Sequence, residues 1–344
     1  MTDVDIRVPG RVGRITLNRP DALNALNEPM MQMIDESLRR WAEDDAVAMV
    51  VIDAEGERAF CAGGDIAALY RRTQAGDLAF SRDFWRDEYR MNARIANYPK
   101  PYIALMDGIT MGGGVGLSAH GSHRIVTERS KIAMPECAIG LIPDVGGTFL
   151  LSRAPGRLGE FLGLTGARMG AADAIHAGFA DVFVAADRLP DLIQALIDEP
   201  DVRVIDDFVD TPLPGELEAN RATIDDIFAA DDLATIVDRV KGEVGSAWHE
   251  KVAQALARAC PLALHCTFRM IREARAMETL EEALAAEYRY TWRSLEEGEF
   301  MEGIRAAVID KDREPRWAKS GLEQVTEADV EVMLAPLGKN ELTF

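Results

Sequence analysis

Residues 108–116 read GITMGGGVG and directly follow the short apolar run PYIALM at residues 101–106. The apolar run predicts a strand, and the residues after the glycines open a helix. Glycines at such a junction let the backbone approach a ligand closely, and the N–H groups of a helix start point outward at it. Taken alone, however, a loop of this kind is more often a tight turn that holds no ligand.

A second glycine segment has the same setting. Residues 59–65 read AFCAGGD, follow a predicted strand, and lead into an expected helix over residues 66–70. Two backbone N–H groups from separate loops are the usual construction of an oxyanion hole, which stabilises negative charge on a carbonyl oxygen during acyl transfer. The pair of loops therefore makes acyl chemistry one option.

A third segment, MPECAIGLIPDVGG at residues 134–147, places Glu136 and Asp144 in apolar surroundings punctuated by glycine and proline. Carboxylates in such surroundings need a partner or a chemical role. The alternative is that both are loop or capping acids, with Asp144 as the N-cap of a helix over residues 145–151. Spacing alone does not separate these two interpretations.

Around these segments the first half of the chain alternates predicted strands and helices, which indicates an α/β fold. The predicted strands cover residues 14–17, 46–53, 101–106, 124–127 and 181–184. A helix is expected where Met30, Ile34, Leu38 and Trp41 recur at helical spacing. Beyond about residue 200 the pattern becomes almost entirely helical. We therefore expect a core at residues 1–205 and a mainly helical C-terminal region at residues 206–344.

Composition limits the function classes. The 344 residues include 58 acidic and 38 basic side chains, a net charge of −20, which disfavours nucleic acid and anionic membranes as partners. The four cysteines lack metal-site spacing, and residues 1–10 lack the apolar segment of a signal peptide. No apolar run is long enough to span a membrane. These features predict a cytoplasmic protein that uses no metal.

A dinucleotide fingerprint is a weaker alternative. Residues 114–119, GVGLSA, match G-x-G-x-x-A, but Glu128 follows Gly114 by 14 positions, whereas the fingerprint places its acid about 20 residues on. A nicotinamide-dependent oxidoreductase is therefore disfavoured. The chain also lacks the G-x-S-x-G motif and the G-x-x-x-x-G-K-[ST] phosphate loop.

The three segments, in this order, resemble the crotonase (enoyl-CoA hydratase/isomerase) superfamily. The similarity continues through PYIALMDGITMGGG and through EGIRAAVIDKD at residues 302–312, so it spans nearly the whole chain. The resemblance implies an α/β fold with a crotonase (ClpP-like) ββα spiral core. It also implies C-terminal helices that cover the site or mediate self-association, so a homo-oligomer is one expected state.

The resemblance assigns roles to particular residues. The N–H groups of Gly64 and Gly113 would bind the thioester oxygen, and Glu136 and Asp144 would be the catalytic acids. Glu136 would attack the thioester or activate water, and Asp144 would bind a hydroxyl on the acyl group or position water. Further contacts to substrate are expected from Glu88, which also fits an exposed helix acid, and from the glycine loops, at Ala62, Gly63, Asp65 and Gly112.

The acids also separate the subfamilies. Hydratases of the superfamily carry a glutamate where this chain has Gly116, and a small residue where it has Asp144. The resemblance is therefore strongest to the hydrolase branch, and it implies cleavage of the thioester of 3-hydroxyisobutyryl-CoA, or a close short-chain 3-hydroxyacyl-CoA, in valine degradation. The alternatives are an enoyl-CoA hydratase or isomerase, an NAD-dependent oxidoreductase, and a non-catalytic acyl-CoA-binding protein.

No cofactor is expected, because coenzyme A would be part of the substrate. Its phosphates need a local basic patch despite the net charge of −20. The candidates for that patch are Arg19, Lys100, Arg153 and Lys311.

Overall fold

The computed structural model describes residues 2–242 and 245–344. The chain divides into two compact units, each assembled from three segments. Unit 1 consists of Met1–Asp65, Arg90–Ala133 and Arg168–Glu218, and unit 2 of Ile66–Tyr89, Met134–Ala167 and Ala219–Phe344. The predicted boundary at residue 205 divides the chain by function, into a catalytic core and a helical extension. This division stays a prediction.

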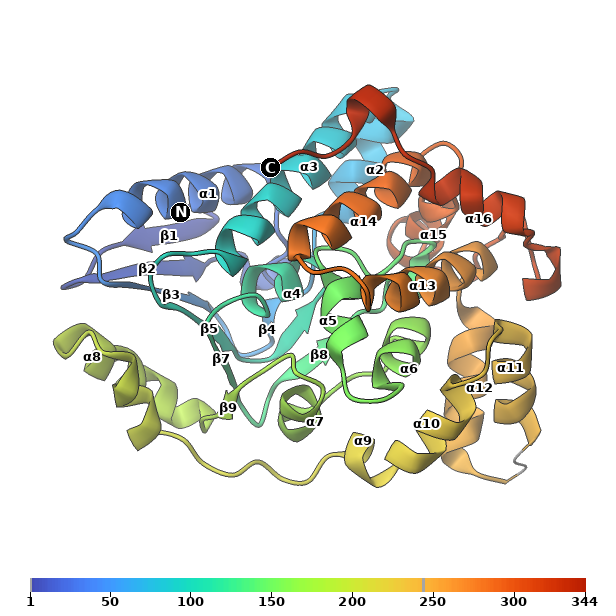
Figure 1. Cartoon of the computed structure of the whole chain (residues 1–344). Coiled ribbons are helices and arrows are strands. Elements are labelled where there is room, and N and C mark those ends of the chain that lie inside the picture. The colour runs from blue at the N-terminus through green and yellow to red at the C-terminus, as the bar shows by residue number, and fades with distance from the viewer. Residues whose placement is uncertain (1, 243–244) are drawn as a thin grey trace. The chain divides into compact units, whose positions relative to one another are not determined.

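Unit 1 contains both sheets of the part of the chain that the structure describes. The larger sheet has the order β1-β2-β3-β5-β7-β9, and the smaller one the order β4-β6-β8 (Figure 1). β1 is antiparallel to β2, and every other neighbouring pair is parallel. The strands are β1 (Val4–Arg7), β2 (Val12–Leu17), β3 (Met49–Ala54), β4 (Ala59–Cys61), β5 (Tyr102–Met106), β6 (Ile109–Met111), β7 (His123–Val126), β8 (Lys131–Ala133) and β9 (Val182–Phe183).

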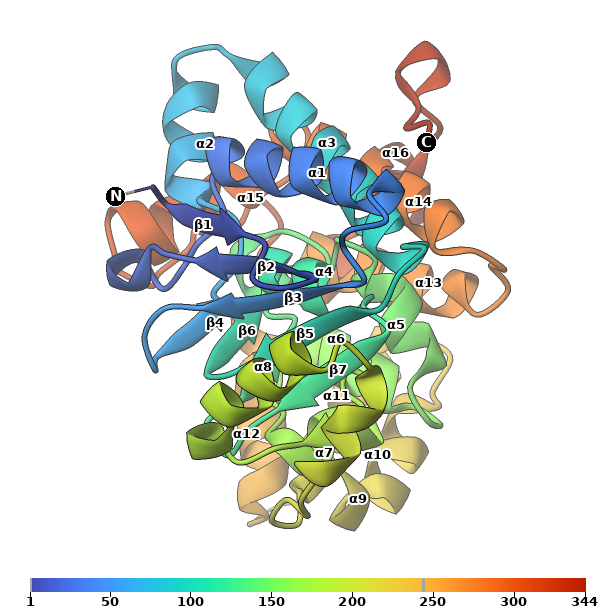
Figure 2. The ribbon, with the colours of Figure 1, turned by 90° about the vertical axis from the view of Figure 1, so that its left-hand side faces the viewer.

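Helices cover both faces of the larger sheet, because its central parallel strands are apolar on both sides. α1 (Glu28–Glu43) lies on one face and α8 (Leu189–Asp198) on the other (Figure 2). Val51 and Leu105 belong to the apolar cluster that packs against α8. The four residues that predicted α1 by their spacing are all buried in it. The expected helix and strands of this half are therefore confirmed.

The strands alternate between the two sheets along the chain, so that β3 is followed by β4, β5 by β6, and β7 by β8. β6 leads directly into α4 (Gly113–Ser118), which completes one ββα repeat. The three strands of the smaller sheet were not predicted from the sequence. Each has three residues, which is too short to show an alternating pattern.

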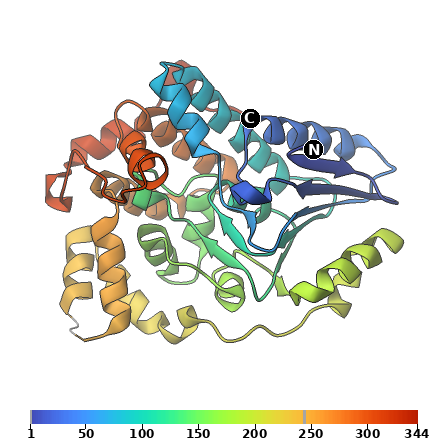
Figure 3. The same cartoon turned by 180° about the vertical axis from the view of Figure 1, so that it is seen from behind.

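Unit 2 is helical. Its helices are α2 (Ile66–Gln74), α5 (Gly147–Arg153), α6 (Leu158–Thr165), α10 (Arg221–Phe228), α11 (Leu233–Gly242), α12 (Ala247–Arg258), α13 (Pro261–Ala274), α14 (Leu280–Ser294), α15 (Phe300–Ile304) and α16 (Glu327–Leu334). α13 packs against both α5 and α6 (Figure 3), α14 also packs against α5, and a 3-10 helix, η2 (Glu136–Ile139), precedes α5. The helices that remain are α7 (Ala171–His176) in unit 1, and α3 (Leu78–Ala96) and α9 (Glu216–Ala219), whose residues are shared between the units.

Candidate active site

The loop after β4 is held in an extended path in unit 1 by backbone hydrogen bonds to the segment before α1. Leu26 N–H donates to the Gly63 carbonyl at 2.8 Å, and Ala62 N–H donates to the Leu23 carbonyl at 3.0 Å. Gly63 has a φ of +115°, which a residue with a side chain rarely adopts. These bonds fix the direction of the peptide that follows, which carries the N–H of Gly64.

The second glycine loop of unit 1 lies against the first. A Cβ built on Gly63 would be 3.9 Å from Gly113 N, and one built on Gly114 would be 2.2 Å from the Cys61 carbonyl oxygen. Glycine at 114 is therefore required for α4 to begin this close to β4. Among residues 2–242 and 245–344, no protein acceptor takes the N–H of Gly64 or of Gly113. Two free donors on adjacent loops are what an oxyanion hole requires.

Two neighbouring predicted site residues stabilise this loop in the structure. The Asp65 carboxylate accepts a hydrogen bond from the Arg19 guanidinium at 3.1 Å. The Ala62 N–H is occupied by the Leu23 carbonyl, as described above. Gly112 has a φ of +49° and is the N-cap of α4. The roles of Ala62, Asp65 and Gly112 in binding substrate stay predictions.

The predicted acids gather in unit 2, where they are almost completely buried. The exposed fraction is 4% for Glu136, 5% for Asp144 and 3% for Glu88. Glu88 is therefore not the exposed helix acid that the sequence left as an alternative. Within the described residues, Glu136 Oε2 and Glu88 Oε1 have no hydrogen-bond partner. Buried carboxylate oxygens without a partner are unusual, and they indicate a place for a ligand or for water.

The same burial changes the acidity of these groups. Burial first, and then the charge of Asp144, raise the pKa of Glu136 and of Glu88 well above 4.5. Burial also raises the pKa of Asp144 to about 6, although the hydrogen bond from Tyr89 opposes the shift. A carboxyl group with a raised pKa is a stronger base once it is ionised, which suits general-base or nucleophilic work.

Asp144 does not cap a helix through its side chain, so that interpretation is wrong. α5 begins at Gly147, and its N-cap is Gly146, which has no side chain to cap the helix. Asp144 Oδ2 instead accepts a hydrogen bond of 2.7 Å from the Tyr89 hydroxyl. The intervening Val145 has a φ of +53°, which interrupts the helix before Gly147.

Two residues beside this group of acids were not predicted from the sequence: Tyr89, whose hydroxyl donates to Asp144, and Glu287, whose charge raises the pKa of Glu136. Glu287 is fully buried and accepts hydrogen bonds from Gly146 N–H at 2.7 Å and Thr148 N–H at 2.9 Å. Its place was visible in the sequence, because it follows Leu280 by seven residues and so falls on the apolar face of α14. An acid on an apolar helix face is a signal of a buried role.

Three of the four candidate phosphate-binding cations are engaged by protein acceptors. Arg19 donates to Asp65 and to the Ala25 carbonyl, and Lys100 donates to the Trp41 and Asp44 carbonyls near the end of α1. Arg153 donates to the Ala274 and Met277 carbonyls. Lys311 is exposed.

No group of three or more His, Cys, Asp or Glu side chains suited to a metal ion occurs in the described residues. Nor does any described helix combine the length and the apolar character that crossing a membrane requires.

Solved structures with this arrangement define the class of protein. The crystal structure of an enoyl-CoA hydratase from Rhodobacter sphaeroides 2.4.1 matches with a TM-score of 0.95 and 54% identity, covering 100% of both chains. That of a carnitinyl-CoA dehydratase from Mycobacterium thermoresistibile matches with a TM-score of 0.95 and 44% identity, covering 100% of this chain and 99% of the other. The predicted fold, a crotonase spiral core with a helical C-terminal region, is confirmed.

Sequence comparison gives the family. A family model described as enoyl-CoA hydratase/isomerase matches residues 12–334, and the chain belongs to this family. A mitochondrial 3-hydroxyisobutyryl-CoA hydrolase of Gallus gallus is 41% identical over 99% of this chain and 90% of the relative. The resemblance inferred from the three sequence segments is thereby confirmed.

Proposed function

We propose that the protein hydrolyses the thioester of 3-hydroxyisobutyryl-CoA, or of a close short-chain 3-hydroxyacyl-CoA, to the free hydroxy acid and coenzyme A. Such a reaction fits a step of valine degradation. The chicken relative, which is similar along nearly the whole chain, supports the proposal by its name.

The observation that carries the proposal is the position of the acids. Glu136 and Asp144 are buried together in unit 2, whereas α4 reads GGVGLS and offers no carboxylate. Superfamily hydratases use a glutamate at the position of Gly116, together with the equivalent of Glu136, to add water to a double bond. Without the first acid, the hydratase mechanism lacks one of its two proton-transfer groups. The acids therefore favour hydrolysis, although the Rhodobacter structure is of a protein named as a hydratase.

The roles follow from the chemistry of thioester cleavage. The N–H groups of Gly64 and Gly113 would stabilise the negative charge that develops on the thioester oxygen. Glu136 would remove a proton from the attacking water, or would attack the carbonyl carbon itself to form an anhydride that water then opens. In both routes the carbon–sulfur bond breaks and coenzyme A leaves as the thiolate. Asp144 would accept a hydrogen bond from the substrate hydroxyl, and Glu88 would line the acyl pocket.

The remaining proposals concern the setting of the reaction. Hydrolysis by these groups uses no metal or redox cofactor, and coenzyme A enters as part of the substrate. A homo-oligomer, the absence of nucleic-acid and membrane partners, and a cytoplasmic location stay predictions. The chicken relative is named as mitochondrial, so localisation of a tagged protein would decide the compartment.

Thiol release from a panel of acyl-CoAs tests the function. We expect free thiol from short 3-hydroxyacyl-CoAs and much less from acyl-CoAs that lack the hydroxyl. Loss of enoyl absorbance without thiol would support a hydratase instead, and a nicotinamide-dependent signal would support an oxidoreductase. Binding without any turnover would leave an acyl-CoA-binding protein. A single turnover in ¹⁸O water then separates the two routes, because only a nucleophilic Glu136 acquires the label.

A further inference from the structure

Glu287, a residue of α14, caps the N-terminus of another helix, α5. Its Oε2 accepts from Gly146 N–H at 2.7 Å, and its Oε1 accepts from Thr148 N–H at 2.9 Å and contacts the Thr148 hydroxyl at 2.5 Å. A helix N-terminus is usually closed by the side chain of its own N-cap, but the N-cap of α5 is Gly146. The Glu287 carboxylate, from α14, therefore supplies the side-chain acceptor that the N-cap of α5 lacks.

The turn that Glu287 holds is the one that carries Asp144. Val145 has a φ of +53° and Gly146 a φ of +79°. The left-handed conformation is unfavourable for a β-branched residue and persists where surrounding contacts impose it. The turn's own backbone bond, from Gly147 N–H to the Asp144 carbonyl at 2.7 Å, is followed directly by the two bonds to Glu287.

α14 also reaches the side chain of Asp144. Thr291 lies one helical turn after Glu287, and its Oγ1 is 3.5 Å from the Tyr89 hydroxyl. That hydroxyl donates to Asp144 Oδ2 at 2.7 Å. The Tyr89 ring packs edge-on against Tyr288, the residue after Glu287, with ring centroids 6.1 Å apart. One helix therefore contacts both the backbone turn of Asp144 and the partner of its carboxylate.

We propose that Glu287 is a positioning residue that sets the orientation of Asp144, and through it the preference for acyl groups with a 3-hydroxyl. This inference depends on the proposed function, in which Asp144 binds that hydroxyl. Glu287 itself makes no contact with substrate in the proposal. Its effect passes through the Asp144–Val145–Gly146 turn.

Two variants of the closing contacts give a graded test. Glu287→Gln keeps the shape of the side chain but replaces one acceptor oxygen with an NH₂ donor, so it cannot accept from both backbone N–H groups. Thr148→Val removes only the hydroxyl and leaves both backbone bonds. Its effect should have the same direction and be smaller.

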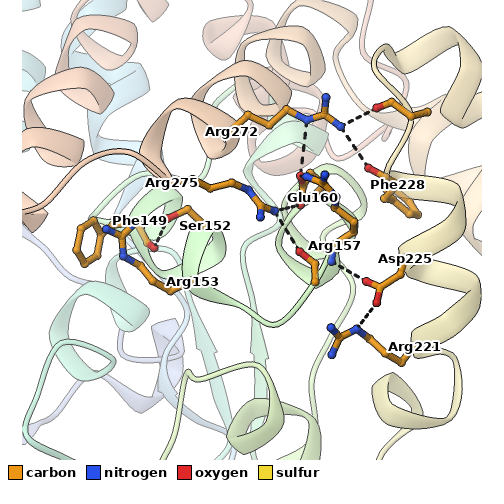
Figure 4. Close-up of polar contacts among 12 residues, drawn as sticks. Phe149, Ser152, Arg153, Arg157, Glu160, Arg221, Asp225, Phe228, Arg272 and Arg275 are labelled. Atoms are coloured by element: carbon orange, nitrogen blue, oxygen red, sulfur yellow. Dashed lines mark hydrogen bonds and ion pairs between the residues drawn. The ribbon is translucent and has the colours of Figure 1, made fainter.

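Glu160 offers a matched control in the same unit. It is also a fully buried carboxylate with polar partners, since it pairs with Arg157 at 2.9 Å and Arg275 at 2.8 Å, and Arg272 lies 3.6 Å away (Figure 4). These contacts lie at the start of α6 and the end of α13, and they do not include Asp144 or its turn. Glu160→Gln should therefore lower stability without changing acyl preference.

The measurement is the ratio of kcat/KM for a short 3-hydroxyacyl-CoA to that for the same acyl-CoA without the hydroxyl. We expect Glu287→Gln to lower this ratio about tenfold, Thr148→Val about twofold, and Glu160→Gln not at all. In an Asp144→Asn background, Glu287→Gln should cause no further loss, because the positioned group is gone. An unchanged ratio in Glu287→Gln would overturn the proposal, as would an unchanged ratio in Thr148→Val if Glu287→Gln does not fold.

The crystal structure of a variant tests the positioning role of Glu287 independently of the proposed function. If the unmodified protein releases no thiol from any 3-hydroxyacyl-CoA, the proposed function fails, and the structure of the Glu287→Gln or Thr148→Val variant decides the positioning role. We expect the hydrogen bond between Tyr89 and Asp144 to be lost or rearranged. A contact retained at 2.7 Å, with the φ of Val145 unchanged, would show that Glu287 does not position Asp144.

Discussion

Glu136 and Asp144 illustrate how a buried acid is prepared for chemistry. Desolvation disfavours the ionised carboxylate and raises the pKa of both groups, and the charge of Asp144 raises the pKa of Glu136 further. The hydrogen bond from Tyr89 stabilises the buried carboxylate of Asp144, whereas Glu136 Oε2 has no partner among the described side chains and backbone groups. The less satisfied of the two is the better candidate for the reacting group, because substrate or water must occupy that position.

The first prediction concerns Glu136. Glu136→Gln should lower thiol release about 10²–10⁴-fold, since an amide can neither attack the thioester nor accept the proton of water. The fold should remain intact, because the Oε2 atom loses no hydrogen bond in the exchange. Turnover within about tenfold of the unmodified protein, with unchanged urea unfolding, would contradict the catalytic assignment.

The second prediction concerns pH. The ionised form of Glu136 is the active one, so kcat/KM should rise with pH through its raised pKa, and activity should be lost in acid well above pH 4.5. Asp144→Asn removes a neighbouring negative charge that raises this pKa. The acid limb of the profile should therefore move to lower pH, even though turnover is reduced. A limb that stays in place or moves to higher pH would show that the limb reports another group or a coupled pair.

Short elements place the backbone donors of the site. β4 and β6 have three residues each and pair in parallel, which brings the loop after β4 beside the start of α4. Their close approach depends on Gly114, where a Cβ would lie 2.2 Å from a backbone oxygen of Cys61.

The third prediction tests this approach. Gly114→Ala should destabilise the protein by about 1–3 kcal/mol, because backbone rather than a flexible side chain must move. It should also lower turnover at least about tenfold, since the Gly64 and Gly113 donors are displaced relative to one another. Gly170→Ala is the control in the same unit, because it has open space around it and a φ of −78°. Its stability should stay within about 1 kcal/mol, with unchanged turnover, measured by urea unfolding and thiol release.

The elements also show how far sequence can go. Spacing predicted α1 and the longer strands, because Met30, Ile34, Leu38 and Trp41 repeat with the period of a helix. The glycine loops were found from composition, and their roles came from family resemblance. The apolar face of α14 indicates that Glu287 is buried, but the contacts of Tyr89 and Glu287 join segments far apart in the chain, which no local pattern encodes. The αL conformation of Val145, which decides that Asp144 is not an N-cap, is likewise invisible in the residue type.

At the scale of the whole molecule, the net charge of −20 opposes a substrate that carries the phosphates of coenzyme A. A local basic patch would offset this repulsion. Arg19, Lys100 and Arg153, however, donate to acceptors of the protein itself. Arg19 is paired with the Asp65 carboxylate, whereas Lys100 and Arg153 are held by carbonyl groups that leave their charge in place. We therefore expect the summed negative charge to be the main electrostatic influence on the encounter with substrate.

The fourth prediction follows from that field. Raising the ionic strength from about 0.01 M to about 0.15 M shortens the Debye length from about 30 Å to about 8 Å, so it should weaken the repulsion. We expect kcat/KM for the acyl-CoA to rise about threefold or more over this range, with kcat nearly constant. The weaker repulsion speeds the association of enzyme and substrate and leaves the chemical step unchanged. The matching acyl-pantetheine thioester, which lacks the phosphates, is the control and should show no such rise. A fall in kcat/KM with salt for the CoA thioester alone would mean that a local group of cations outweighs the net charge. Replacing Lys311, the exposed candidate, by Met would then test whether it belongs to that group.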